Sequence, residues 1–147
     1  MFCKKFKITS KHVAPDLLEI YLRKGVYPYE YMDNWHKFDV TKLLSKEAFY
    51  SRLNNFHISD KEYEYAQAVW NKMDCKTMKD YHDIYLKTDV LLLADIFQSF
   101  RETALDRYKL DPLWYYSTPR LAWDVLFLMT KQQLELITDQ DMYLMVE

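Results

Sequence analysis

The chain has 147 residues, a formal net charge of −2 and one glycine, Gly25. A single glycine excludes glycine-rich phosphate loops, dinucleotide-binding fingerprints and nucleophile elbows, because these motifs need glycine where backbone turns sharply or meets a ligand. The net charge argues against a free-standing nucleic-acid-binding domain, which is usually basic.

The first residues carry the densest group of positive charges, which we interpret as a solvated terminus. These cations are Lys4, Lys5, Lys7 and Lys11. We expect a short strand over residues 6–8. Residues 15–23 then predict a helix whose apolar side chains share one face, with Gly25 as its stop.

Residues 26–39 are aromatic, non-periodic and interrupted by Pro28, which predicts an ordered extended loop packed by its rings. A short helix is expected over residues 46–53. Ser59 and Glu62 have the spacing of a capping box, in which each side chain bonds the other residue's backbone N–H. The box predicts a helix running from there to about Met73.

Three more helices follow in the sequence. Thr77 begins a long one that ends near Tyr108, and Thr118-Pro119 begins another, since proline is tolerated in the first helical turn. The last begins at Thr138 and still runs at Glu147, so we expect the natural chain to continue. The segment is therefore predicted to be mainly α.

The long helix has a continuous apolar stripe at 100° per residue. Its members are Tyr81, Tyr85, Leu92, Leu93, Ile96, Phe100 and Ala104. Asp89 lies near the middle of this stripe, one turn after Tyr85. An unpaired buried carboxylate is costly. Asp89 is therefore either a core aspartate paired with an arginine or with backbone N–H groups, or a functional carboxylate.

Other carboxylates on this helix have weaker claims to a site. Asp95 flanks the stripe and is a candidate for a partly buried role. Asp80 and Asp83 fall on the polar face, where a solvated role is expected.

The sequence Tyr85-Leu86-Lys87-Thr88-Asp89 resembles the third exonuclease motif, Tyr-x-x-x-Asp, of family B DNA polymerases. Further matches resemble the protein-primed branch found in viruses, organellar plasmids and self-synthesising transposons. These matches are residues 24–32 (Lys-Gly-Val-Tyr-Pro-Tyr-Glu-Tyr-Met), 58–60, 118–119 and 121–124. The resemblance covers roughly residues 24–147.

The resemblance implies a DNA-directed DNA polymerase (a nucleotidyltransferase) with a 3′–5′ proofreading exonuclease, acting in replication of a virus or mobile element. Residues 1–110 would be the C-terminal part of an α/β, RNase H-like exonuclease domain, and residues 111–147 a helical lead-in to the palm. The implied partners are primer-template DNA with its single-stranded 3′ end, the rest of the polymerase chain and a terminal priming protein.

The resemblance also implies roles for three residues. Asp89 would bind Mg²⁺ or Mn²⁺, Tyr85 would orient the attacking water or the phosphate, and Lys24 would stabilise charge at the phosphate. Lys24 can equally be read as a surface lysine at a helix end. The family's Asp-x-Glu strand, its Asn/Asp motif and its palm aspartates are missing, so the segment alone should be inactive.

The remaining residues favour an intracellular, soluble protein. Cys3 and Cys75 form no disulfide framework, and no signal peptide is present. The four histidines have no zinc-ligand spacing. The longest apolar run, residues 90–94, is too short to cross a bilayer. Trp114-Tyr115-Tyr116 is expected to pack two helices together, or else to stack on single-stranded DNA.

A second interpretation needs no enzyme. The chain could be a helical interaction module, or a decayed mobile-element remnant. This alternative predicts a closed core in which Asp89 has an internal partner.

Overall fold

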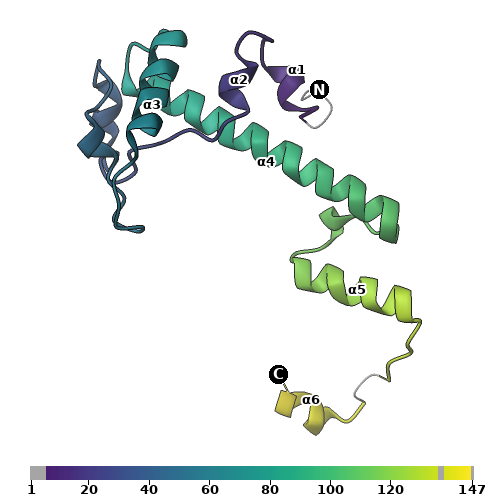
Figure 1. Cartoon of the computed structure of the whole chain (residues 1–147). Coiled ribbons are helices and arrows are strands. Elements are labelled where there is room, and N and C mark those ends of the chain that lie inside the picture. The colour runs from purple at the N-terminus through teal and green to yellow at the C-terminus, as the bar shows by residue number, and fades with distance from the viewer. Residues whose placement is uncertain (1–5, 136–137, 147) are drawn as a thin grey trace. The chain divides into compact units, whose positions relative to one another are not determined.

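A computed structural model describes residues 6–135 and 138–146 (Figure 1). Its internal contacts divide the chain into two units, Met1–Phe97 and Gln98–Glu147, and each is described by itself. Helices dominate both units. The described residues contain no strand, only an isolated bridge between Ser51 and Phe56. The mainly helical fold predicted for the segment is confirmed.

The core of the first unit lies between helix α3, Asp60–Lys72, and the first half of helix α4, Met78–Tyr108. The predicted capping box begins α3: the Ser59 hydroxyl accepts from the Glu62 N–H at 3.3 Å, and the Glu62 carboxylate accepts from the Ser59 N–H at 2.8 Å. Helices α3 and α4 confirm the two helices predicted from Ser59 to about Met73 and from Thr77 to near Tyr108, with ends within one residue of those expected.

A second reciprocal cap begins α4. The Asp80 carboxylate accepts from the backbone N–H groups of Lys76 and Thr77, each at 2.9 Å, and the Thr77 hydroxyl accepts from the Asp80 N–H at 3.4 Å. These hydrogen bonds hold the pKa of Asp80 below its usual value. Asp80 is partly exposed, and its side chain also satisfies the free N–H groups of the helix start, a role that the sequence did not indicate.

The N-terminal elements differ from the prediction. Residues 6–8 form a turn that leads into helix α1, Thr9–His12, where a strand was expected. Helix α2, Leu18–Tyr21, is shorter than the predicted 15–23. Gly25 does not stop it, because Leu22 is the C-cap and Gly25 does not have a positive φ.

Residues 24–28 have no regular secondary structure, as expected for the start of the aromatic loop. It then continues into the 3₁₀ helix η2, Trp35–Asp39, which the sequence did not predict; the Asn34 side chain caps η2 by accepting from the His36 N–H at 3.1 Å. The helix expected over residues 46–53 is the shorter 3₁₀ helix η3, Lys46–Phe49.

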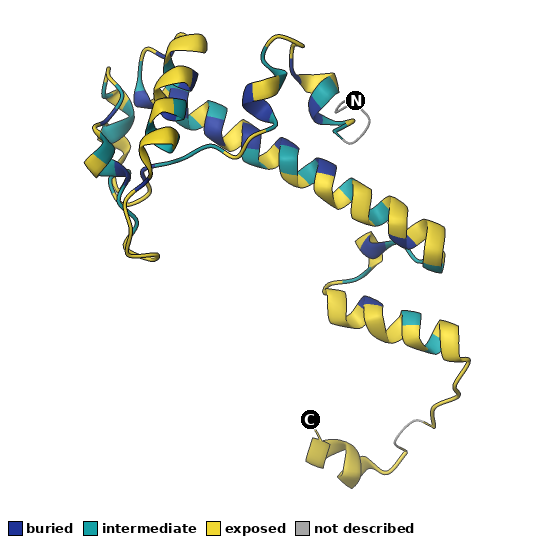
Figure 2. Ribbon diagram, in the orientation of Figure 1, coloured by how far each residue is buried: buried dark blue, intermediate teal, exposed yellow. Residues whose placement is uncertain are grey.

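The buried face of helix α4 matches the predicted stripe only in part (Figure 2). Tyr81, Tyr85 and Ala104 of the stripe are buried. Leu93 and Ile96, placed in the stripe, are 67% and 63% exposed. The buried face is made by Met78, Tyr81, Tyr85, Thr88, Leu91 and Asp95. The helix is apolar over more than half its circumference, and the rest of the first unit covers only one side of it. Periodicity alone could not show which side.

The second unit contains the end of α4, the 3₁₀ helix η4, Pro112–Trp114, helix α5, Thr118–Thr130, and helix α6, Gln140–Val146. Arg101 binds Asp111 through two guanidinium nitrogens at 2.6–2.9 Å. The predicted start of α5 is confirmed. Helix α6 begins two residues after Thr138, because the Asp139 carboxylate caps it. The last residue, Glu147, lies outside the described residues.

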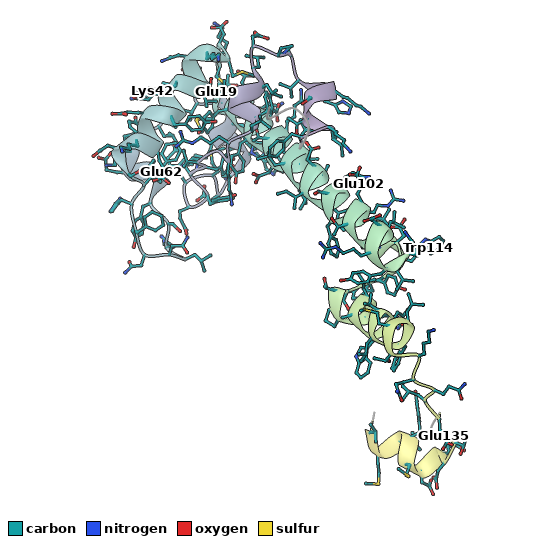
Figure 3. The ribbon with its side chains drawn as sticks, turned by 45° about the vertical axis from the view of Figure 1, so that its right-hand side comes forward. Glu19, Lys42, Glu62, Glu102, Trp114 and Glu135 are labelled. Atoms are coloured by element: carbon teal, nitrogen blue, oxygen red, sulfur yellow. The ribbon has the colours of Figure 1, made fainter. Side chains whose placement is uncertain are left out.

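The aromatic run before α5 does not pack two helices. Trp114, labelled in Figure 3, is 88% exposed and Tyr116 is fully exposed, so that expectation is wrong for both rings. Only Tyr115 is half-buried, and its hydroxyl bonds Asp124, which raises the Tyr115 pKa.

In the part of the chain that the structure describes, no helix combines the length and the apolar character needed to span a membrane.

Candidate functional site

Tyr85 is held on α4 by the aromatic loop. Its ring stacks on that of Tyr27 with centroids 4.8 Å apart and an interplanar angle of 26°. Gly25 lies against the same ring, and a methyl group at Gly25 would lie 3.0 Å from Tyr85 Cδ2. Gly25, the only glycine of the chain, is thus favoured because a side chain there would crowd the Tyr85 ring, and its φ is not positive.

The hydroxyl of Tyr85 belongs to a short polar chain. It lies 2.5 Å from the hydroxyl of Tyr29 and within hydrogen-bonding reach of the Asp89 carboxylate, one turn further along α4. Burial raises the Tyr85 pKa most, and the bonds to Tyr29 and Asp89 raise it further. Tyr85 therefore stays protonated at neutral pH and acts as a hydrogen-bond donor.

Asp89 is half-buried and lies at the border of the core. Beside it on α4 are Leu86, Val90 and Leu93, whose side chains are 51%, 57% and 67% exposed. Its neighbour is a tyrosine hydroxyl, rather than the arginine or backbone N–H groups that a core aspartate was expected to find. The carboxylate is accessible at the edge of an apolar surface.

The fully paired, buried carboxylate of α4 is Asp95. It is 4% exposed, and its two oxygens accept from the Ile8 N–H at 2.7 Å, the Thr9 N–H at 2.9 Å and the Thr9 hydroxyl at 2.6 Å. Burial alone would raise the Asp95 pKa, but these three bonds hold it below its usual value. The buried core aspartate of α4 with its hydrogen bonds made is thus Asp95. The sequence indicated only a partly buried role for Asp95.

Lys24 is exposed and, among the residues that the structure describes, takes part in no ion pair. It precedes Gly25 directly, so the Gly25–Tyr85 contact brings the Lys24 segment to α4 from a distant part of the sequence. Its backbone is therefore near Tyr85, and the residue is exposed.

Two further residues of α4 fix the loop. The Tyr81 hydroxyl donates to the Val26 carbonyl at 2.7 Å, and the Tyr27 hydroxyl lies 2.8 Å from His82 Nδ1. The sequence indicated no role at this site for His82 or for Tyr29. One sequence feature could have indicated these contacts. Residues 27–31 are dense in tyrosine, and the start of α4 carries three side chains that can hydrogen-bond to them, Tyr81, His82 and Tyr85.

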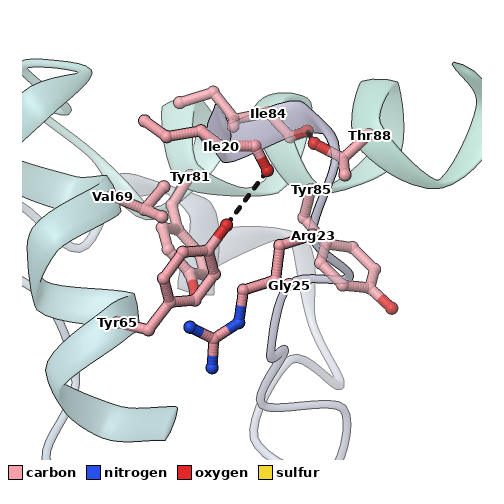
Figure 4. A pocket seen from close by; sticks show the side chains of 9 residues that line it. All are labelled: Ile20, Arg23, Gly25, Tyr65, Val69, Tyr81, Ile84, Tyr85 and Thr88. Atoms are coloured by element: carbon pink, nitrogen blue, oxygen red, sulfur yellow. Dashed lines mark hydrogen bonds between the residues drawn. The ribbon is translucent and has the colours of Figure 1, made fainter. Parts of the chain in front are cut away.

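The pocket beside Tyr85 is a packing gap (Figure 4). Its cavity of about 10 Å³, bordered by Gly25, Tyr65 and Tyr85, has room for about one water molecule. Within residues 6–135 and 138–146, no three His, Cys, Asp or Glu side chains are grouped to hold a metal. One carboxylate does not fit a two-metal centre, so Asp89 could hold Mg²⁺ or Mn²⁺ only beside carboxylates that this chain does not supply.

Comparison of the chain with protein families, with curated proteins and with solved structures finds no match.

Proposed function

We propose that the chain is a segment of a protein-primed family B DNA polymerase, carrying the C-terminal part of the 3′–5′ exonuclease domain and the lead-in to the palm. One observation carries the proposal. Gly25, which directly follows Lys24, packs against the tyrosine of the Tyr-x-x-x-Asp motif, so two segments matched separately in the sequence meet at one place on α4.

The side chains support a binding role at that place. A protonated Tyr85 hydroxyl can donate to a phosphate oxygen or to a water molecule, and the free Lys24 amine can neutralise phosphate charge. Asp89 supplies an accessible carboxylate beside them. The other metal-binding carboxylates would come from elsewhere in the parent polypeptide, and the segment by itself would cleave no DNA.

The exposed apolar face next to Asp89 agrees with a parent domain that packs further elements there. Contact with such elements would bury the side chains of Leu86, Val90 and Leu93. Each Å² of apolar surface buried there would contribute about 25 cal/mol of stabilising free energy. The same face equally supports the second candidate, a non-enzymatic helical interaction module. The two functions differ in what covers the face and in whether Asp89 takes part in chemistry.

The activity of the parent polypeptide tests the proposal. The uninterrupted reading frame that contains this chain should encode an Asp-x-Glu strand upstream and a glycine-pair motif with palm aspartates downstream. Its product should extend a primer and degrade a single-stranded 3′ end, both dependent on Mg²⁺ or Mn²⁺. A frame closed by stop codons on both sides, or a product with neither activity, would leave the interaction module as the function.

A further inference from the structure

A continuous row of rings leads away from the Tyr85–Asp89 site. Tyr27 stacks on Tyr85, and its centroid lies 5.4 Å from that of His82. His82 meets Phe38 at 4.9 Å, and Phe38 meets Trp35 at 5.6 Å. Tyr29 joins the same end as Tyr85, 5.1 Å from Tyr27. The row connects two turns of α4 with the loop and η2.

The row is rigid inside and open at its ends. The inner rings of Tyr27, His82 and Tyr85 are fixed by the hydrogen bonds between Tyr27 and His82 and between Tyr29 and Tyr85. The end rings are accessible, with Trp35 82% exposed and Tyr29 65% exposed. Preorganised aromatic faces bind flat ligands at a low cost in conformational entropy.

Few charges accompany the rings. Lys24 lies at the Tyr85 end, and Lys37 beside Trp35 is placed over the Tyr31 ring at 4.1 Å. Asp33 and Asp39 are exposed in the same stretch of chain. The nearly balanced charge means that stacking, rather than phosphate neutralisation, must supply most of the affinity of any nucleic acid bound here.

We propose that this row is a stacking platform for the bases of a single strand whose 3′ end lies at Asp89, and that Trp35 contacts the base furthest from that end. This inference rests on the proposed function and adds a binding surface to it. Bases suit the platform because every base has a π-face, which makes stacking tolerant of sequence.

The test is the affinity of the 147-residue chain for a fluorescent oligothymidylate, measured by anisotropy at low salt and without metal. Trp35→Ala should weaken binding about fivefold or more, whereas Trp35→Phe, which keeps a stacking ring, should stay within about threefold of wild type. Phe56→Ala is the matched control, because Phe56 is 49% exposed in the same unit and lies outside the row. It should leave the affinity unchanged.

Absence of wild-type binding overturns the platform, as does a Trp35→Ala affinity within about twofold of wild type or an equal loss in Phe56→Ala. A steep decrease of affinity with salt would also contradict it, since that identifies phosphate contacts as the source of binding. The assay needs no cleavage. If the platform fails while exonuclease activity of the parent still depends on Asp89, then the proposed function stands without it.

Discussion

Asp89 and Asp95 have the same side chain on the same helix but opposite environments. Asp95 is buried and accepts three hydrogen bonds from the start of α1, whereas Asp89 is half-buried beside a tyrosine hydroxyl and exposed leucines. A carboxylate with all its bonds made has little capacity for a ligand. The residue with spare accepting capacity at an accessible edge is therefore Asp89.

Asp95→Asn should reduce the free energy of unfolding by about 1–3 kcal/mol, because the amide group would present N–H donors to the N–H groups of Ile8 and Thr9. The Asp95 pKa is lowered in the folded chain, so its carboxylate stabilises the fold above its unfolded pKa of about 3.9, and that contribution is lost as pH falls through the folded pKa.

Urea unfolding at several pH values measures this effect. The difference between wild type and Asp95→Asn should be constant from about pH 5 to pH 7 and shrink below about pH 4. The control Asp83→Asn removes an exposed pair with Lys79 and should cost less than about 1 kcal/mol. Equal effects of the two substitutions would contradict the role assigned to Asp95.

Gly25→Ala should destabilise the first unit by about 1–3 kcal/mol, because its methyl group would press on a Tyr85 ring already held by Tyr27 and Tyr29. A double-mutant cycle with Tyr85→Ala checks the cause by urea unfolding. In the Tyr85→Ala background the cost of Gly25→Ala should disappear. A cost of the same size in both backgrounds would show that the contact with Tyr85 is irrelevant.

At this scale the sequence indicated Tyr85, Asp89 and Lys24 as site residues, and their catalytic roles stay predictions. It could not indicate that Tyr29 and His82 complete the site, because hydrogen-bond partners so distant in the chain depend on how the loop crosses α4. Nor could it identify Asp95, whose donors are backbone N–H groups and carry no side-chain signal.

The elements that the sequence predicted well are those with local signals at their ends. The Ser59–Glu62 box and the Thr118-Pro119 pair mark helix starts within a few residues, and both helices form there. Residues 6–8 have no such signal. There the Asp95 carboxylate accepts from the N–H groups of Ile8 and Thr9, which favours a helical turn over the expected strand. The buried face of α4 was predicted only in part, because two adjacent faces are apolar.

Ser59→Ala should destabilise α3 by about 1 kcal/mol, because the Glu62 N–H loses its acceptor and Glu62 loses the Ser59 hydroxyl. Ser117→Ala is the matched control, since Ser117 is the N-cap of α5 but its side chain makes no cap hydrogen bond. Urea unfolding followed by circular dichroism should show a loss for the first variant only. Similar losses in both would mean that serine at a cap acts through backbone preference.

At the scale of the whole molecule, the two units leave large apolar side chains exposed. Leu93 and Ile96 do so in the first unit, and Trp123, Met129 and Met145 in the second. Exposed apolar surface on helices with one covered face is typical of interfaces. The sequence could predict the helical content but not what these surfaces contact. The same apolar residue types occur in a protein core and in an interface, so the residue type alone does not distinguish the two.

The most direct test of the proposed function is the 3′–5′ exonuclease rate of the polypeptide encoded by the complete reading frame, compared between Asp89→Ala and Asp83→Ala. Asp89→Ala should lose about 100-fold or more of the exonuclease rate while primer extension is retained. Asp83→Ala should lose none, because the Asp83 side chain is exposed and paired with Lys79. An Asp89→Ala enzyme with undiminished exonuclease activity would contradict the assignment of this chain to an exonuclease site.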